Sequence, residues 1–153
     1  ENAVISGAGG TTPTGIVLQS GVTSVSGSNL AWSGVAQMEA GVLPYERGDL
    51  GWIVGSGAAQ TLRGRMREAG SGMPIFGDTG IGGRLTLASL ACPTATAVFG
   101  AWSSLLLCAW SPIEFAADPF SSFNTGKVSL RFRQAVDVVL QAGAAFAKTE
   151  SVT

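Results

Sequence analysis

The stretch VSLRFRQAVDVVL, residues 128–140, alternates apolar and polar side chains. Even positions are apolar (Leu130, Phe132, Val136, Val138, Leu140), and odd positions are polar (Lys127, Ser129, Arg131, Arg133, Asp137). Because successive side chains of a strand point to opposite faces, the stretch predicts one long, half-buried antiparallel strand with a bulge at Gln134. We expect Leu130, Phe132, Val136 and Val138 to be buried together, so Phe132→Ala should cost about 3–5 kcal/mol.

The remaining sequence predicts an α+β fold in which strands predominate. Apolar side chains at Ala31, Val35, Met38 and Val42 keep near-helical spacing and indicate a helix that ends before Pro44. A second helix is expected over 58–69, where Leu62 and Met66 share one face. Short apolar runs between glycine, proline and serine predict strands over 15–18, 50–54, 85–90, 97–99, 105–110 and 113–115.

The composition indicates a single domain with an unusually uncharged surface. Of the 153 residues, 46% are hydrophobic and only 12% are charged, which is about half the usual charged share. A surface with so little charge is normally covered by partner subunits or by a membrane. The net charge of −1 excludes the basic footprint of a nucleic-acid-binding protein.

A membrane association is the remote alternative, because no charged residue lies between Arg84 and Glu114. Pro93 and several polar residues interrupt that segment, and no unbroken apolar run reaches the ~18 residues of a spanning helix. Short buried strands explain the segment better. The two cysteines, Cys92 and Cys108, have apolar neighbours and are predicted to be buried thiols in a reducing compartment.

The sequence predicts no catalytic residue, no cofactor and no metal site. It contains no histidine, the commonest general base and metal ligand. The glycines after Ile5 lack the third glycine of a dinucleotide fingerprint, and Lys127 is followed by Val128 where a phosphate loop needs serine or threonine. Glu114 and Asp118 are expected in a solvated turn, and two cysteines cannot complete a zinc site.

Three arginines, Arg63, Arg65 and Arg67, form the only basic cluster. Their alternate spacing spreads them around a helix, where they would be solvated or would contact phosphate or an acidic neighbour. Because this spread disfavours a shared phosphate site, we treat them as candidate subunit-interface residues that meet an acidic patch on another copy.

Three stretches, in this order, resemble the major capsid proteins of tailed bacteriophages with the HK97-type fold. They are AVISGAGGTTPTGIVLQSGV at 3–22, GMPIF at 72–76 with CPTATAVFGAWSS at 92–104, and IEFAADPFSSFNTGKVSLRFRQAVDVVLQAGAAFAK at 113–148. The first resembles the segment after the family's spine helix, where the glycines form a turn. The last, in which an acidic-Pro-aromatic turn leads into a long strand, is the most specific.

The resemblance implies mixed antiparallel sheets with flanking helices. It places the family's N-terminal arm, extended loop and spine helix before Glu1, so we expect a C-terminal portion. It also implies a peripheral lobe that begins over 1–39, an axial lobe over 40–110, and a return to the peripheral lobe over 111–153. The family's lysine-dependent cross-link is not expected, since the lysine's region is missing and the other two positions fall near Gly126 and Arg133.

The function implied by the resemblance is structural. Copies of the subunit would assemble into pentamers and hexamers of an icosahedral phage head, built in the bacterial cytoplasm. Its partners would be copies of itself and, indirectly, packaged DNA, with no small-molecule substrate and no membrane. An encapsulin-type shell around protein cargo is the alternative, and an enzyme would require a convergent site that the sequence does not display.

Overall fold

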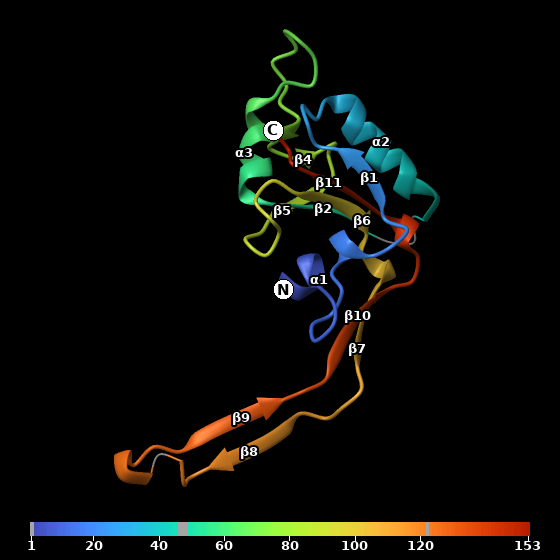
Figure 1. Ribbon diagram of the computed structural model, residues 1–153. Helices are drawn as coiled ribbons and strands as arrows, with labels where there is room; N and C mark the ends of the chain where they lie inside the picture. Colours follow the sequence, from blue (N-terminus) through green and yellow to red (C-terminus); the bar gives the residue numbers. More distant parts are fainter. Residues whose placement is uncertain (1, 46–48, 122) are drawn as a thin grey trace.

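A five-stranded mixed sheet forms the centre of the molecule (Figure 1). The computed structural model describes residues 2–45, 49–121 and 123–153. The strand order is β1-β11-β6-β2-β5, with parallel outer pairs (β1 with β11, β2 with β5) and antiparallel inner pairs. Its strands are β1 (Thr23–Ser26), β2 (Leu50–Val54), β5 (Leu85–Ala88), β6 (Ala97–Ala101) and β11 (Phe146–Glu150).

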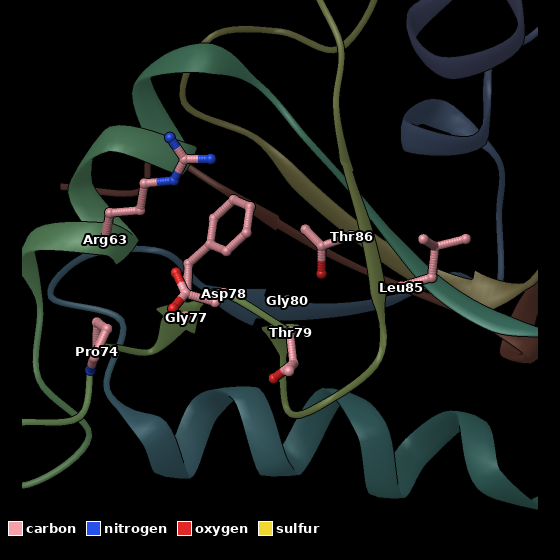
Figure 2. Close-up of a pocket in the computed structure, with 9 residues that line it drawn as sticks. Arg63, Pro74, Gly77, Asp78, Thr79, Gly80, Leu85 and Thr86 are labelled. Atoms are coloured by element: carbon pink, nitrogen blue, oxygen red, sulfur yellow. The ribbon is translucent and has the colours of Figure 1, made fainter.

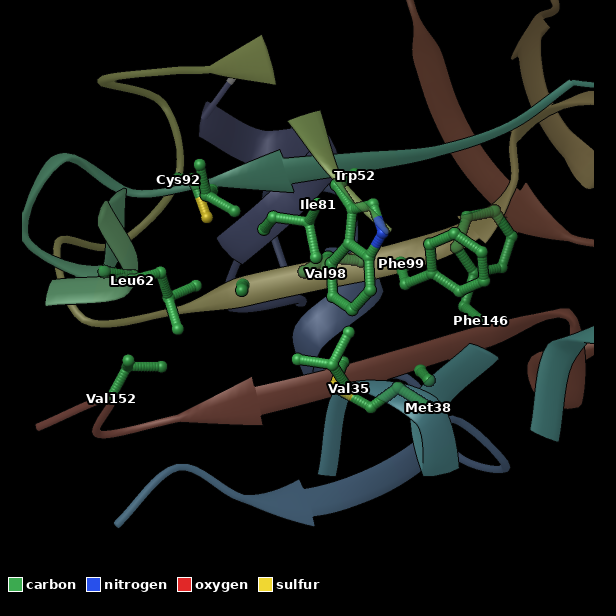
Figure 3. Close-up of a cluster of buried hydrophobic side chains, with 14 of the residues drawn as sticks. Val35, Met38, Trp52, Leu62, Ile81, Cys92, Val98, Phe99, Phe146 and Val152 are labelled. Atoms are coloured by element: carbon green, nitrogen blue, oxygen red, sulfur yellow. The ribbon is translucent and has the colours of Figure 1, made fainter. Parts of the chain in front are cut away.

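Helix α2 (Trp32–Val42) covers one face of this sheet, and the main core lies beneath it (Figure 3). Three positions of the predicted helical stripe, Val35, Met38 and Val42, are buried, whereas Ala31 is exposed and precedes the helix in an extended conformation. They pack over Trp52 of β2 and Phe99 of β6, whose ring centroids lie 4.6 Å apart. Strands β2 and β6 can lie inside the sheet because their sequences, LGWIV and AVFGA, are apolar throughout. A central strand that is buried on both faces requires such a sequence.

The opposite face is covered in part by α1 (Asn2–Ser6) and a short 3-10 helix over Ile16–Leu18. Between them the glycine-rich segment folds back on itself: the Gly15 N–H donates to the Gly7 carbonyl at 2.9 Å. A Cβ on Gly15 would lie 2.4 Å from the Gly7 nitrogen, so the close approach requires glycine. The glycines form a turn, as expected. Residues 15–18 are not the predicted strand, because Ile16–Leu18 form a 3-10 helix.

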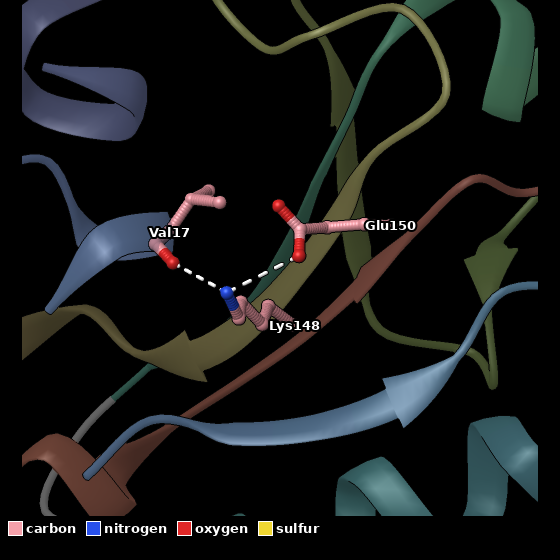
Figure 4. A network of polar contacts seen from close by, with 3 residues as sticks. All are labelled: Val17, Lys148 and Glu150. Carbon is pink, nitrogen blue, oxygen red and sulfur yellow. Dashed lines mark hydrogen bonds and ion pairs between the residues drawn. The ribbon is translucent and has the colours of Figure 1, made fainter. Parts of the chain in front are cut away.

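Lys148 ties this N-terminal segment to the sheet (Figure 4). From β11 its ammonium donates to the Val17 carbonyl at 2.6 Å and lies 3.2 Å from the Glu150 carboxylate. A charged hydrogen bond of this kind is stronger than a neutral one. The segment before β1 is therefore fixed across the strands β11 and β6.

A long two-stranded ribbon projects from the sheet (Figure 1). Near the sheet, β7 (Leu105–Ala109) pairs with β10 (Val136–Leu140); farther out, β8 (Glu114–Asp118) pairs with β9 (Ser129–Arg133). Gln134 and Ala135 separate β9 from β10, so the predicted single strand is two strands. At this break the Trp110 N–H donates to the Ala135 carbonyl at 3.3 Å.

The predicted burial of the ribbon is largely wrong. Leu130, Phe132 and Val136 are 57%, 68% and 43% exposed, and Val138 alone of the four is buried, at 5%. The alternation is present, but a strand face is buried only where another layer covers it. Val138 lies at the base of the ribbon, where the Gln19 amide donates to its carbonyl at 3.3 Å.

The second predicted helix is shorter than expected: α3 spans Ser56–Gly64. Glycine is a poor helix former, and Arg65 beyond it is extended, its carbonyl accepting the Ile75 N–H at 2.8 Å. The residues between form a loop that returns to the short strands β3 (Phe76–Gly77) and β4 (Gly80–Ile81). Cys92 is buried as predicted, Cys108 is half-buried, and both are free thiols.

Candidate interaction surfaces

The outer part of the ribbon has one apolar and one polar face. Residues directly opposite each other in an antiparallel pair share a face. Phe115 therefore faces the same side as Phe132, at 5.3 Å between ring centroids, and Ala117 the same side as Leu130. The other face carries Glu114, Ala116, Asp118, Ser129, Arg131 and Arg133. A two-stranded ribbon in water is marginal without a further layer, so its apolar face needs a partner.

The tip of the ribbon is shaped by Asp118. Its carboxylate accepts the backbone N–H groups of Phe120 and Ser121, at 2.9 and 3.1 Å, and the Ser121 hydroxyl. These hydrogen bonds, led by that of Ser121, lower the pKa of Asp118 from its ordinary value. The turn displays Phe120, which is 82% exposed. The tip thus adds a further exposed apolar side chain to the ribbon.

A second apolar surface lies on the sheet itself, on the face opposite α2. We call Ile53, Leu85, Leu87 and Trp102 the open sheet face. Two adjoining grooves of about 510 and 330 Å³ share Ile53, Leu87 and Trp102; Asp49 lines the first and Val4 of α1 the second. Leu85 and Leu87, on the edge strand β5, are 68% and 54% exposed. Within the described ranges, α1 and the 3-10 helix leave this part of the sheet uncovered.

Of the predicted arginine cluster, only Arg63 lies on a helix. It belongs to the last turn of α3, and its guanidinium is 4.6 Å from the centre of the Phe76 ring. Arg65 donates to the carbonyls of Leu30 and Thr153. Arg67 lies 4.3 Å from the ring centre of Trp32 on α2 and donates to the Pro74 carbonyl at 3.3 Å. All three thus stabilise the chain's own fold, and their contact with another subunit stays a prediction.

An open polar groove of about 840 Å³ lies between α3 and the β3–β5 region (Figure 2). Its ionisable groups are Arg63 and Asp78. Thr86 of β5 already has hydrogen-bond partners in the preceding turn. Its hydroxyl accepts the Ile81 N–H at 2.9 Å and donates to the Arg84 carbonyl at 3.1 Å. This lining contains no paired nucleophile and base, so it offers no arrangement for covalent or acid–base chemistry.

The described residues offer neither a metal site nor a membrane-spanning helix. Within residues 2–45, 49–121 and 123–153, no three histidine, cysteine, aspartate or glutamate side chains group together in a way that could hold a metal ion. Over the same ranges, no helix has the length and apolarity needed to cross a membrane.

The chain, with its glycine turn, its sheet and its projecting ribbon, is similar to known proteins in sequence and in fold. The model of the phage capsid family matches residues 1–151, almost the whole chain. The chain belongs to the phage capsid family. No curated protein matches it significantly by sequence.

Solved capsid structures share the fold along the whole chain. The capsid of a native GTA particle, computed with C5 symmetry, has a TM-score of 0.73 at 17% identity over 99% of this chain and 60% of that chain. A structure of Gordonia phage Cozz gives 0.65 at 15% identity, covering 97% and 57%. A virus-like particle from Pyrococcus furiosus gives 0.62 at 11% identity, covering 97% and 61%. The chain therefore spans about 60% of the length of the chains in these three structures.

The interaction surfaces of this capsid-family chain were only partly visible in its sequence. The alternation over 128–140 located the apolar face of the ribbon but suggested that the chain would bury it. The open sheet face was missed, because Leu85 and Leu87 look like core residues of a strand when their neighbours are unknown. Their position on an edge strand depends on the strand order alone.

Proposed function

We propose that the chain is part of a structural subunit that associates with copies of itself to form a phage capsid. Membership of the phage capsid family supports this, as does the likeness to solved capsids. The observation that carries the proposal is the exposed apolar face of the ribbon, with Phe115 and Phe132 59% and 68% exposed. A monomer rarely leaves such a surface in water, whereas a shell subunit covers it with a neighbour.

We propose a structural rather than a catalytic role, as a component of the virion. Family membership favours the phage capsid over an encapsulin-type compartment. Assembly in the host cytoplasm, rings of five and six, and indirect contact with packaged DNA follow from the resemblance. The resemblance implies lobes over 1–39, 40–110 and 111–153. We propose different bounds: the ribbon over 105–140 forms the peripheral lobe, and the sheet that joins β1 and β11 to β2, β5 and β6 forms the axial lobe with its helices.

Light scattering of the 153-residue chain across a range of concentrations tests the proposal. We expect small oligomers whose fraction grows with concentration, and no shell-sized particles, because the chain spans about 60% of matched capsid subunits. Electron microscopy of the same samples checks for shells. A chain that stays monomeric at the highest attainable concentration would contradict self-association, and complete shells would contradict the need for further segments.

A further inference from the structure

The open sheet face lacks the helix layer that covers the other side of the sheet. Sheets that are apolar on both faces normally carry a layer on each. Here α2 covers one face, whereas Leu85 and Leu87 on the other remain largely exposed beside the half-buried Ile53 and Trp102. The groove along them, of about 510 Å³, has a single charged lining residue, Asp49.

Within the described part of the chain, no other element covers the outer face of helix α2. Ser33, Ala36, Gln37, Ala40 and Gly41 are exposed, and none of them is charged. The one charged residue of α2, Glu39, is half-buried against the chain's own Trp52 and Gly82. Since a solvated helix face normally carries charged residues, this small and uncharged face is suited to lie flat against an apolar surface.

Charge at the ends of the two surfaces is complementary. The residue before α2, Ala31, provides no side-chain cap, and the first turn has no acidic residue, so the positive end of the helix dipole is not neutralised there. Arg67, stacked on Trp32, adds a positive charge at the same end. Asp49, an exposed carboxylate, lies at the end of the groove beside the open sheet face. A carboxylate near a helix N-terminus is stabilising.

We propose that the partner of the open sheet face is α2 of a second copy of this chain, with Asp49 of one copy at the N-terminus of α2 of the other. The contact completes a helix–sheet–helix arrangement across two copies. It joins different surfaces of the two copies, because α2 and the open sheet face lie on opposite sides of the sheet. Such head-to-tail contacts close into rings when the rotation allows. The inference rests on the proposed function and names the contact that makes the ring.

Cysteine pairing tests this contact directly. In a Cys108→Ser background, Ala40→Cys is placed on the outer face of α2 and Leu87→Cys on the open sheet face, both at exposed positions. Under mild oxidation, we expect each single variant to remain uncross-linked and a mixture of the two to form disulfide-linked dimers. The double variant should give a ladder of linked oligomers. Ser24→Cys, exposed on the opposite edge strand β1, combined with Leu87→Cys is the matched control and should remain uncross-linked.

The outcomes separate this contact from the proposed function. Dimers from Leu87→Cys alone would show a two-fold contact and overturn the head-to-tail arrangement. If light scattering shows association but no disulfide forms between residues 40 and 87, the inference is overturned and the proposed self-association stands. Absence of association in every variant would overturn both. Thermal melts of each reduced variant, expected to match the parent, show that a negative result does not arise from unfolding.

Discussion

At the scale of single residues, Glu39 carries a carboxylate whose ionised form is destabilised by burial. It projects from α2 under the turn after β4, where a Cβ on Gly82 would lie 2.4 Å from its carboxylate oxygen. Burial raises the pKa of Glu39 above its ordinary value, and Trp52, Arg84 and Arg67 oppose the rise. The buried carboxylate oxygen and the Trp52 indole nitrogen lie close together without reaching hydrogen-bond geometry. The ionised carboxylate is therefore less favourable in the folded chain than in the unfolded one.

We expect Glu39→Gln to stabilise the protein near pH 7. A carboxyl whose folded pKa is raised binds its proton more readily in the folded state, so the parent should gain stability as the pH falls towards the unfolded pKa of about 4.5. Glutamine is neutral at every pH, so it should remove this pH dependence. Urea unfolding between pH 5 and 8 measures both effects, and Glu68→Gln, at an exposed position, is the control. A loss of stability at pH 7 would show that the arginines outweigh burial.

The buried thiol of Cys92 illustrates the same effect of burial. Burial raises the pKa of Cys92 to about 11, and its thiol donates to the Thr96 carbonyl at 3.4 Å. Since the thiolate is the reactive form, Cys92 is inert in the folded chain. Only Cys108, which is half-buried, therefore needs replacement in the cross-linking experiment.

At the scale of elements, apolar side chains contribute to the stability of the chain in the sheet but contribute little in the outer ribbon. The strands β2 and β6 are buried on both faces, so each apolar side chain there contributes to the core. The strands β8 and β9 are exposed on both faces, and their apolar residues contribute little until a partner covers them. The same residue type therefore has different effects in the two elements.

A pair of phenylalanine substitutions measures this contrast. Phe99→Ala should destabilise the isolated chain by about 3–5 kcal/mol, because the ring is fully buried against Trp52. Phe132→Ala should cost less than about 1 kcal/mol, since its ring is 68% exposed and contacts Phe115. Chemical denaturation of dilute monomer gives both values. A cost above about 2 kcal/mol for Phe132→Ala would mean that the ribbon is covered within one chain.

At the scale of the whole molecule, association should be driven by apolar contact. The exposed ribbon face and the open sheet face are uncharged apart from their edges, and the chain has only 9 basic and 10 acidic residues. Apolar burial is strengthened by sulfate, which is excluded from protein surfaces, whereas contacts between charges are screened by any salt.

We therefore expect sodium sulfate to increase the oligomeric fraction in sedimentation velocity experiments. Sodium chloride at equal ionic strength is the control, and it should change the fraction little because Asp49 and the N-terminus of α2 form one small electrostatic contribution. A marked loss of oligomers in sodium chloride would indicate that charged groups, the three arginines among them, dominate the contact.

The sequence by itself carried the resemblance to the capsid family, in the order of three stretches over 3–22, 72–104 and 113–148. It also determined the fold class, the buried central strands and a helix that ends before Pro44. These depend on local periodicity and on the order of glycine and proline turns, both of which are written along the chain.

Only the tertiary structure decided which apolar faces are covered. The alternation over 128–140 predicts two faces but does not say what lies against either one, and within the described chain the outer ribbon receives no covering layer. Likewise, Leu85 and Leu87 are exposed because β5 is an edge strand and α2 lies on the other side of the sheet. Burial is a property of neighbours brought together from distant parts of the chain or from another copy, so local sequence cannot determine it.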